Sequence, residues 1–249
     1  MAGHSHWANI KHKKAANDAR KAKVITQMGR LIKGAIQVGG PDVDMNPRLR
    51  LAIQKAKAQN MTNDAIDRII AKAKGQAGGA AMEELVYEGY GAGGVAVVVE
   101  SMTDNRNRTA PEIRKLFERG GGSMGAPGCV AWQFHDKAVF VVADSTEDAV
   151  LEALLLADCD AEDITPDDDG SVEIVAQSDQ YEAIATALGK AGLSIDRSDL
   201  TKIPDNDVEV TDLEVAERIQ RLLDHLEDHE DVTGVHTNFA PSPEIAEQL

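Results

Sequence analysis

Apolar residues in the first third of the chain recur with the period of an α-helix, in three stretches separated by turn signals. A Gly-Gly-Pro sequence at residues 39–41 ends the first stretch, which covers residues 24–38. Asn46 and Pro47 open the second stretch as N-cap and first-turn proline, and Thr62 has the position of an N-cap for the third. The pattern therefore predicts three short helices that share one apolar interior, which is typical of a small bundle.

The middle of the chain changes to strand-like patterning. A glycine-rich linker over residues 75–80 leads into a predicted strand, a turn and a buried strand, within the sequence LVYEGYGAGGVAVVVESM. A helix follows, in which Thr109 and Glu112 have capping-box spacing and Pro111 falls in the first turn. Glycines then return the chain to a strand that we expect over residues 129–134.

Strands and helices alternate in the second half of the chain. The pattern predicts strand, helix, strand, strand, helix and strand in that order, over residues 138–144, 146–157, 159–165, 171–177, 179–192 and a segment ending near Pro204. This βαββαβ order is that of a ferredoxin-like unit. A further helix, with Thr211 as the expected N-cap and Glu214 at N3, precedes a strand over residues 232–239 that could complete the central unit.

These elements predict an α+β protein: an N-terminal three-helix domain is followed by two ferredoxin-like α/β domains, one of which is inserted in the other. The expected boundaries are a basic arm over residues 1–23, a helical basic domain over 24–79, an α/β domain over 80–135 plus 205–240, and an inserted acidic domain over 136–204.

Charge is strongly segregated along this chain, whose formal net charge is -16. Residues 1–79 hold 15 Lys and Arg against 5 Asp and Glu, whereas residues 128–249 have a net charge of -24. One interpretation is a solvated surface; the other is a cationic end that docks on a nucleic acid. The three-to-one excess of cations favours nucleic acid, because surfaces that only maintain solubility mix both signs.

The basic residues divide among three places. Residues 1–23 carry six cations without an apolar stripe, so we expect an exposed arm that orders on binding. On the helices, Arg30, Lys33, Arg68 and Lys72 are expected to face away from the core. The sequence DNRNRT at residues 104–109 either caps a helix or offers phosphate-binding donors at its start. The candidate nucleic-acid contacts are Lys11, Lys13, Lys14, Arg20, Lys21, Lys23, Arg48, Arg50, Lys55, Lys57, Arg106 and Arg108.

Two motifs, one of glycines and one of acidic residues, resemble a cofactor site and a metal site, but the residues around them do not fit either site. Gly89, Gly91 and Gly94 match G-x-G-x-x-G, but they lead into a strand, whereas a dinucleotide site needs a helix. Asp167 and Asp169 fit part of an EF-hand loop whose first and twelfth positions lack carboxylates, so a turn explains them better.

Histidine spacing does not indicate a metal enzyme either. His225 and His229 are four residues apart, but Leu226 stands where a zincin needs Glu, and His4, His6 and His12 offer at most adventitious chelation. No set of nucleophile, base and orienting group can be assembled. We therefore expect no metal, no cofactor and no enzymatic activity.

Two cysteines, Cys129 and Cys159, are too few for a disulfide framework in a chain of 249 residues, and we expect both to be reduced. No apolar run resembles a signal segment or approaches the roughly 18 residues of a membrane span. The expected location is the cytoplasm, without membrane contact; the oligomeric state is left open.

Five blocks in the first 134 residues resemble the signature sequences of the YebC family, which includes the mitochondrial translational activator of cytochrome c oxidase. These blocks are MAGHSHWANIKHKKAANDA, GGPDVDMNPRLRLAIQKAKAQNM, YEGYGAGGVAVVVE, DNRNRT and GGSMGAPGCVAWQF. The resemblance implies a helical N-terminal domain and two α/β domains, one interrupted by the other. It also implies a DNA-binding transcriptional regulator or, alternatively, a translation factor that acts on ribosomes stalled at consecutive prolines.

We therefore expect a non-enzymatic, nucleic-acid-binding regulator of gene expression, with DNA-binding control of transcription as the main hypothesis. A ribosome-associated translation factor that binds ribosomal RNA is the alternative, since structured RNA supplies the same phosphates. A protein-interaction scaffold that binds no nucleic acid is the third class.

Overall fold

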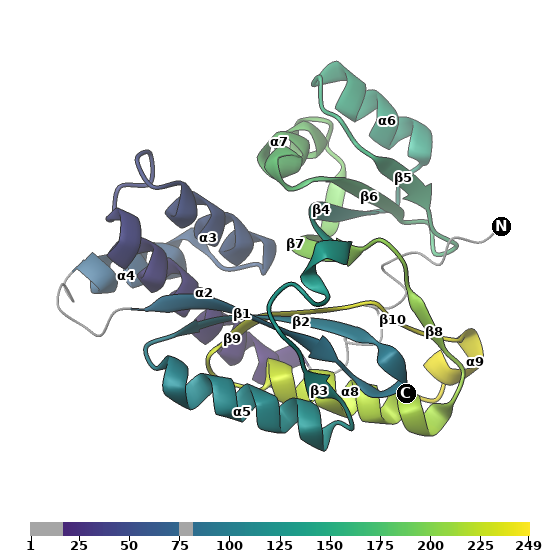
Figure 1. Cartoon of the computed structure of the whole chain (residues 1–249). Helices are drawn as coiled ribbons and strands as arrows, with labels where there is room; N and C mark the ends of the chain where they lie inside the picture. The colour runs from purple at the N-terminus through teal and green to yellow at the C-terminus, as the bar shows by residue number, and fades with distance from the viewer. Residues whose placement is uncertain (1–16, 75–81) are drawn as a thin grey trace. The chain divides into compact units, whose positions relative to one another are not determined.

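A computed structural model describes residues 17–74 and 82–249 of the chain, with side chains from residue 25 onward. The described residues divide into two compact units (Figure 1). One unit consists of residues 136–202, and the other contains residues 17–74, 82–135 and 203–249. The second unit is therefore built from segments on both sides of the first.

Three helices form the N-terminal region, namely α2 (Asn17–Gly39), α3 (Pro47–Ala58) and α4 (Asn63–Lys74). Asn46 caps α3, since its side-chain oxygen accepts a hydrogen bond from the Leu49 amide at 3.1 Å. Thr62 accepts from the Ala65 amide at 3.3 Å at the start of α4. The predicted starts of these two helices are thus confirmed. Their shared core contains Met28, Ile32, Leu49, Ala52, Ala56 and Ile66.

The first helix begins earlier than its apolar pattern indicates. Helix α2 starts at Asn17, whereas the apolar periodicity starts at residue 24. The intervening residues are mainly Ala, Lys and Arg, which are strong helix formers that can extend a helix without an apolar stripe. The last part of the expected arm, residues 17–23, therefore belongs to α2; residues 1–16 lie outside the described part of the chain.

A four-stranded sheet forms the centre of the second unit. Its strands are β1 (Glu83–Tyr90), β2 (Ala96–Thr103), β3 (Ser123–Met124) and β9 (Val232–Thr237), in the order β3-β1-β2-β9. Strands β1 and β2 form an antiparallel hairpin, and β9 pairs antiparallel with β2. The last strand of this sheet therefore comes from the C-terminal segment of the chain, beyond the other unit.

Helices α5 (Arg106–Arg119) and α8 (Leu213–Glu227) pack on one face of this sheet. Apolar side chains of β2 alternate, so that Val97 and Val99 face the helices while Ala96 and Val98 face the opposite side. The chain ends with a two-stranded parallel sheet of β8 (Val208–Val210) and β10 (Phe239–Pro241), followed by α9 (Pro243–Ala246).

The other unit has ferredoxin-like topology. Its elements are β4 (Phe134–Ala143), α6 (Glu147–Leu156), β5 (Asp163–Pro166), β6 (Val172–Gln177), α7 (Tyr181–Lys190) and β7 (Ser194–Pro204). The strand order is β5-β6-β4-β7, and β6 is antiparallel to both of its neighbours. The α+β class, with N-terminal helices followed by sheet-containing domains, is thus confirmed.

Two predicted helix caps are wrong by a few residues. Helix α5 is capped by Asn105, not Thr109, because Thr109 lies inside the helix and its hydroxyl bonds to Asp231 at 2.8 Å. Helix α8 is capped by Asp212, whose carboxylate accepts from the Val215 amide, rather than by Thr211. In both places a neighbouring Asn or Asp, which are among the strongest N-caps, occupies the cap position.

The strand predicted over residues 129–134 is also wrong. Residues Ala131–Gln133 form a short 3-10 helix, η3, and β4 begins only at Phe134. The cause is Glu88, a buried carboxylate on β1 that accepts hydrogen bonds from the amides of Gly128, Val130 and Ala131 at 2.6, 2.9 and 2.7 Å. Amides held in this way are not available for a strand ladder.

We expect Glu88→Gln to destabilise the protein by about 2 kcal/mol at pH 7, because an amide cannot accept three backbone hydrogen bonds as a carboxylate does. Burial raises the pKa of Glu88, but the three amide hydrogen bonds lower the pKa by more than burial raises it. The pKa of Glu88 therefore lies below its ordinary value of 4.5. The contribution of Glu88 is therefore present above pH 4.5 and is lost as pH falls through the lower pKa of the folded state.

Urea unfolding of the wild type and the variant at a series of pH values from 7 to 3 measures this difference. The exposed Glu83→Gln substitution on the same strand is the control, and we expect it to change stability by less than about 0.5 kcal/mol. An E88Q variant as stable as E83Q at pH 7 would contradict the account of the 128–131 turn.

Candidate nucleic-acid interface

Helix α3 carries four of the candidate cations and has three distinct faces. Leu49, Ala52 and Ala56 are buried in the helical core. Arg48 and Lys55 are seven residues apart, so they lie on a second face. Arg50 and Lys57 have the same spacing and lie on a third face. The packing of the core therefore separates the candidate cations into two pairs.

The first pair faces carboxylates of the central sheet. Lys55 Nζ lies 3.1 Å from Glu100 Oε2 on β2, and both side chains are largely buried. Arg48 lies 3.6 Å from Glu84 on β1, in a pair that is exposed on both sides. An exposed ion pair of this kind contributes about 0–1 kcal/mol. Lys55 is thus part of the packing between α3 and the sheet, whereas Arg48 remains accessible.

The second pair is open to solvent. Arg50 is exposed, and its Nη1 donates to the carbonyl oxygens of Val43 and Asp44 at 2.8 and 2.7 Å. These bonds hold the guanidinium in place and use two of its five donor hydrogens. Lys57 is also exposed, near the end of α3. This face of α3 therefore offers two cations to a ligand.

Helix α4 adds exposed cations that are absent from the predicted contacts. Arg68 and Lys72 are four residues apart on the outer side of the helix, as expected from the sequence, and Lys74 is exposed at its end. Asp64 and Asp67 lie on the same helix, so its surface is mixed but cationic on balance. The i, i+4 spacing of Arg68 and Lys72 was the sequence signal that could have placed them among the contacts.

Arg30 on α2 lies away from the core of the three helices, as its spacing predicts, but it does not point into solvent. Its guanidinium pairs with Asp231, which is 0% exposed, and approaches Glu230 at 3.3 Å. Periodicity places Arg30 opposite the core of the three helices. That side of α2 is covered by the sheet, however, and Gly34 of α2 is close enough to Met102 of β2 that a side chain at Gly34 would collide with it.

Arg108 is also engaged inside the protein. Its Nη2 donates to Asp231 Oδ2 at 2.7 Å and to Asp104 Oδ1 at 3.4 Å. Asn105 caps α5, which agrees with the structural interpretation of DNRNRT. Arg106, by contrast, is exposed in the first turn of α5. Of the two arginines in this motif, only Arg106 presents its side chain to solvent in full.

Asp231, which the sequence did not single out, is the centre of this arrangement. Besides Arg30 and Arg108, it accepts hydrogen bonds from the hydroxyls of Thr109 at 2.8 Å and Thr103 at 3.2 Å. Burial raises the pKa of Asp231, but the hydrogen bonds from Arg108 and Thr109 and the nearby arginine charges lower it below its ordinary value of 3.8. The ionised side chain of Asp231, which lies next to β9, thus connects α2 through Arg30, α5 through Arg108 and Thr109, and β2 through Thr103.

The remaining candidates are placed only in part. Lys11, Lys13 and Lys14 lie outside the described residues. Arg20, Lys21 and Lys23 lie in the first turns of α2, but the structure does not describe their side chains. The structure therefore supplies Arg48, Arg50, Lys57 and Arg106 as exposed members of the predicted set, and it assigns internal contacts to Lys55 and Arg108.

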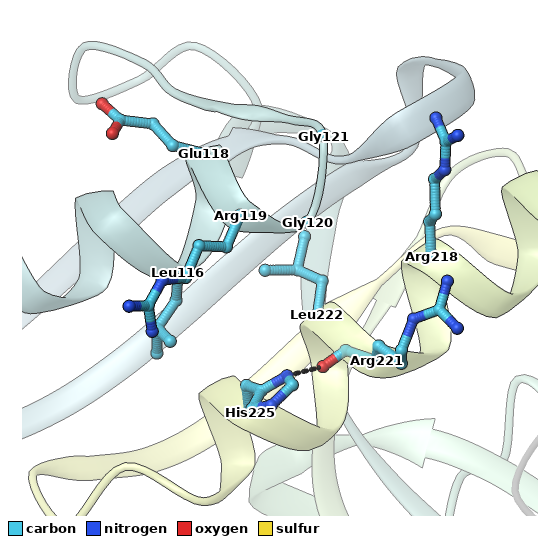
Figure 2. Close-up of a pocket in the computed structure, with 9 residues that line it drawn as sticks. All are labelled: Leu116, Glu118, Arg119, Gly120, Gly121, Arg218, Arg221, Leu222 and His225. Atoms are coloured by element: carbon cyan, nitrogen blue, oxygen red, sulfur yellow. Dashed lines mark hydrogen bonds between the residues drawn. The ribbon is translucent and has the colours of Figure 1, made fainter.

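A second cationic region lies between α5 and α8, where a shallow pocket has a volume of about 320 Å³ (Figure 2). Leu222 lies in the middle of the pocket, with Arg119 pointing to one side of it and Arg218 and Arg221 to the other. Arg218 and Arg221 pair with Glu214 and Glu217 of the same helix at 2.5 and 3.4 Å. Since the arginines do not converge, the pocket does not form a single anion site.

The described residues also bear on metal binding and on membrane insertion. In the part of the chain with described side chains, no cluster of three or more His, Cys, Asp or Glu residues could hold a metal ion. Among the described helices, none combines the length and apolar character needed to cross a membrane.

Comparison with known proteins identifies relatives along the whole chain. Residues 5–76 match the model of the TACO1/YebC protein N-terminal domain, and residues 82–239 match that of the TACO1/YebC second and third domain. A "probable transcriptional regulatory protein" of Moorella thermoacetica is 44% identical over 100% of this chain and 99% of its own length. A protein of the same description from Paraburkholderia xenovorans is 46% identical over 98% of this chain and 100% of its own.

A solved structure agrees with these matches. The crystal structure of a conserved hypothetical protein from Aquifex aeolicus superposes with a TM-score of 0.77 at 40% identity, covering 97% of this chain and 99% of that one. Both domain models and relatives of matching length thus point the same way, and the chain belongs to the TACO1/YebC family.

Proposed function

We propose that this protein is a regulator of gene expression that binds the phosphate backbone of a nucleic acid through its helical domain, with DNA as the target. The observation that carries the proposal is the exposed set of Arg50, Lys57, Arg68 and Lys72 on α3 and α4. These cations belong to a chain whose net charge is -16, so their local excess is not a property of the whole surface. Relatives named probable transcriptional regulatory proteins support the regulatory role.

The chemistry of this surface suits phosphate contacts more than base recognition. Lys and Arg side chains that neutralise phosphates supply affinity and position, whereas sequence is read by side chains that reach base edges. Arg50 is fixed by backbone carbonyls, so its guanidinium is oriented before a phosphate arrives. The names of the relatives describe a regulator rather than an enzyme, and the cationic surface offers no catalytic group.

The alternative target is ribosomal RNA. The two family models that match this chain are those of TACO1/YebC domains, and the family that the sequence resembles includes a translational activator. Structured RNA presents phosphates that the same cations could bind. A translation factor would bind ribosomes through the helical domain, whereas a transcriptional regulator would select particular duplex sequences.

Salt dependence tests whether the cations bind phosphate at all. With about four phosphate contacts, the logarithm of the binding constant should fall against the logarithm of salt concentration with a slope of about -3 to -4. Fluorescence anisotropy of a labelled 20-base-pair duplex, titrated with the full chain between 50 and 300 mM KCl, measures this slope. A slope near zero would remove the helical domain from the proposed function.

The target is tested by two further measurements. Transcription is supported if the protein stays bound to one promoter duplex, and to no other duplex, in the presence of excess unrelated DNA. Translation is supported if the protein sediments with ribosomes at about 150 mM KCl and shows no such preference among duplexes. If neither duplex DNA nor ribosomes retain the protein at any salt concentration, the scaffold hypothesis replaces both.

A further inference from the structure

Helix α6 of the unit formed by residues 136–202 has apolar residues on two faces. Val150, Ala153 and Leu154 are buried in this unit, where α6 lies beside α7 over the sheet (Figure 1). Leu155 and Leu156, however, are 69% and 82% exposed. A surface helix ordinarily shows one apolar stripe and one polar face, so the outer leucines are not explained by packing within the unit.

The exposed leucines form a continuous patch with a defined edge. Leu151, which is 42% exposed, lies four residues before Leu155 and shares its row on the helix surface. The same rows continue toward the start of α6 with acidic residues: Glu147 precedes Leu151 by four positions, and Glu152 precedes Leu156 by four. The outer face of α6 is therefore acidic in its first turn at Glu147, mixed where Leu151 and Glu152 are neighbours, and apolar at Leu155 and Leu156.

The charge of the whole unit extends this acidic edge. Residues 136–202 contain seventeen Asp and Glu against four Lys and Arg. Three of these cations are already paired, since Lys137 lies 2.6 Å from Glu162, Lys202 lies 2.5 Å from Asp136 and Arg197 lies 3.6 Å from Asp199. A ligand of this face consequently meets a strongly negative potential around an apolar centre.

We propose that the outer face of α6 docks a cationic, amphipathic segment of another protein. The apolar side chains of this partner segment would pack on Leu151, Leu155 and Leu156, and its basic side chains would lie near Glu147 and Glu152. Charge complementarity carries the choice of partner, because the same potential repels nucleic acids and anionic membrane surfaces. Helix α6 has ten residues and is about 15 Å long, which matches a partner helix of two to three turns. This inference does not depend on nucleic-acid binding by the helical domain.

A synthetic probe tests the surface directly. We would titrate the full chain into a fluorescein-labelled 14-residue peptide with Leu and Lys at helical spacing, and into a second peptide with Ser in place of Leu. The expected result is that the Leu/Lys peptide binds at least tenfold more tightly than the Ser/Lys peptide at about 100 mM salt, because the apolar patch adds to the charge attraction. Equal affinity for the two peptides would overturn the proposal.

Variants locate the site on α6. The Leu155→Ser/Leu156→Ser double variant should weaken binding of the Leu/Lys peptide at least tenfold, and Glu147→Gln/Glu152→Gln should weaken it and flatten its salt dependence. Val86→Ser, which removes an exposed apolar side chain from β1, is the matched control and should leave the affinity within twofold. Circular dichroism checks that each variant is folded. A double variant that binds as tightly as the control would place the peptide elsewhere and overturn the proposal.

Two other occupants give different results. If the basic arm of the same chain covers α6, neutralising Lys11, Lys13 and Lys14 to Gln should tighten binding of the Leu/Lys peptide more than tenfold. If a second copy covers it, L155S/L156S should lower the mass of the free protein in sedimentation equilibrium. Either outcome would overturn the assignment of this face to another protein, whereas no change in either measurement supports it.

Discussion

A chain that carries Arg50→Glu, Lys57→Glu and Arg68→Glu is expected to bind nucleic acid about 100-fold more weakly than the wild type at ~0.15 M salt. Each lost phosphate contact removes one released counterion, so three contacts account for about two orders of magnitude and for a decrease of about 2.7 in the salt slope. The three side chains are exposed on α3 and α4, so their reversal should leave the helical core intact. Anisotropy titrations of duplex DNA or sedimentation with ribosomes measure the loss.

The second cationic region provides a control of equal charge. Arg119→Glu, Arg218→Glu and Arg221→Glu alter the formal charge by the same amount on α5 and α8. We expect this variant to bind within about threefold of the wild type, because two of its arginines are already paired with Glu214 and Glu217. Greater loss in this variant than in the α3–α4 variant would move the interface to α5 and α8.

Removing the carboxylate of Asp231 is expected to cost about 3 kcal/mol of unfolding free energy, the largest stability effect that we predict. Asp231→Ala leaves Arg30, Arg108 and the hydroxyls of Thr103 and Thr109 without their shared acceptor. Breaking a buried pair by removing one partner costs about 3–5 kcal/mol, and the lower value applies because solvent reaches both arginines. Urea unfolding at pH 7 measures the difference.

The same variant has a defined pH dependence. Because the pKa of Asp231 is lowered in the folded state, its contribution is complete above the unfolded value of about 3.8 and is lost as pH falls through the lower folded value. The wild type and D231A should therefore become equally stable in strong acid. Asp104→Ala removes the exposed partner of Arg108 and serves as control, with an expected cost below about 0.5 kcal/mol. Equal unfolding midpoints for D231A and D104A at pH 7 would contradict the central role of Asp231.

Local signals were sufficient for most of the fold. Period and capping residues predicted α3 and α4, because Asn46 and Thr62 act within three residues of their own position. The order of strands and helices predicted the ferredoxin-like unit, because that topology follows from the order of the elements alone. The start of α2 was missed, since a helix can continue through Ala, Lys and Arg without an apolar signal.

The candidate interface was less predictable, because the partners of its cations are distant in sequence. Arg30 and Asp231 are 201 residues apart, Arg108 and Asp231 are 123 apart, and Lys55 and Glu100 are 45 apart. Helical periodicity shows which side chains avoid the local core, but not what covers the opposite face. The 128–131 turn was misinterpreted for the same reason, since its amides are bound by Glu88 from a strand about 40 residues earlier.

The late position of β9 in the chain has a consequence for synthesis. Strand β9 and Asp231 come after the complete ferredoxin-like unit, so that unit can fold while the central sheet still has an open edge at β2. Until residue 231 has left the ribosome, Arg30 and Arg108 have no shared carboxylate to hold α2 against the sheet. The contact that holds α2 against the sheet through Asp231 therefore depends on a segment that is synthesised after the whole of the other unit.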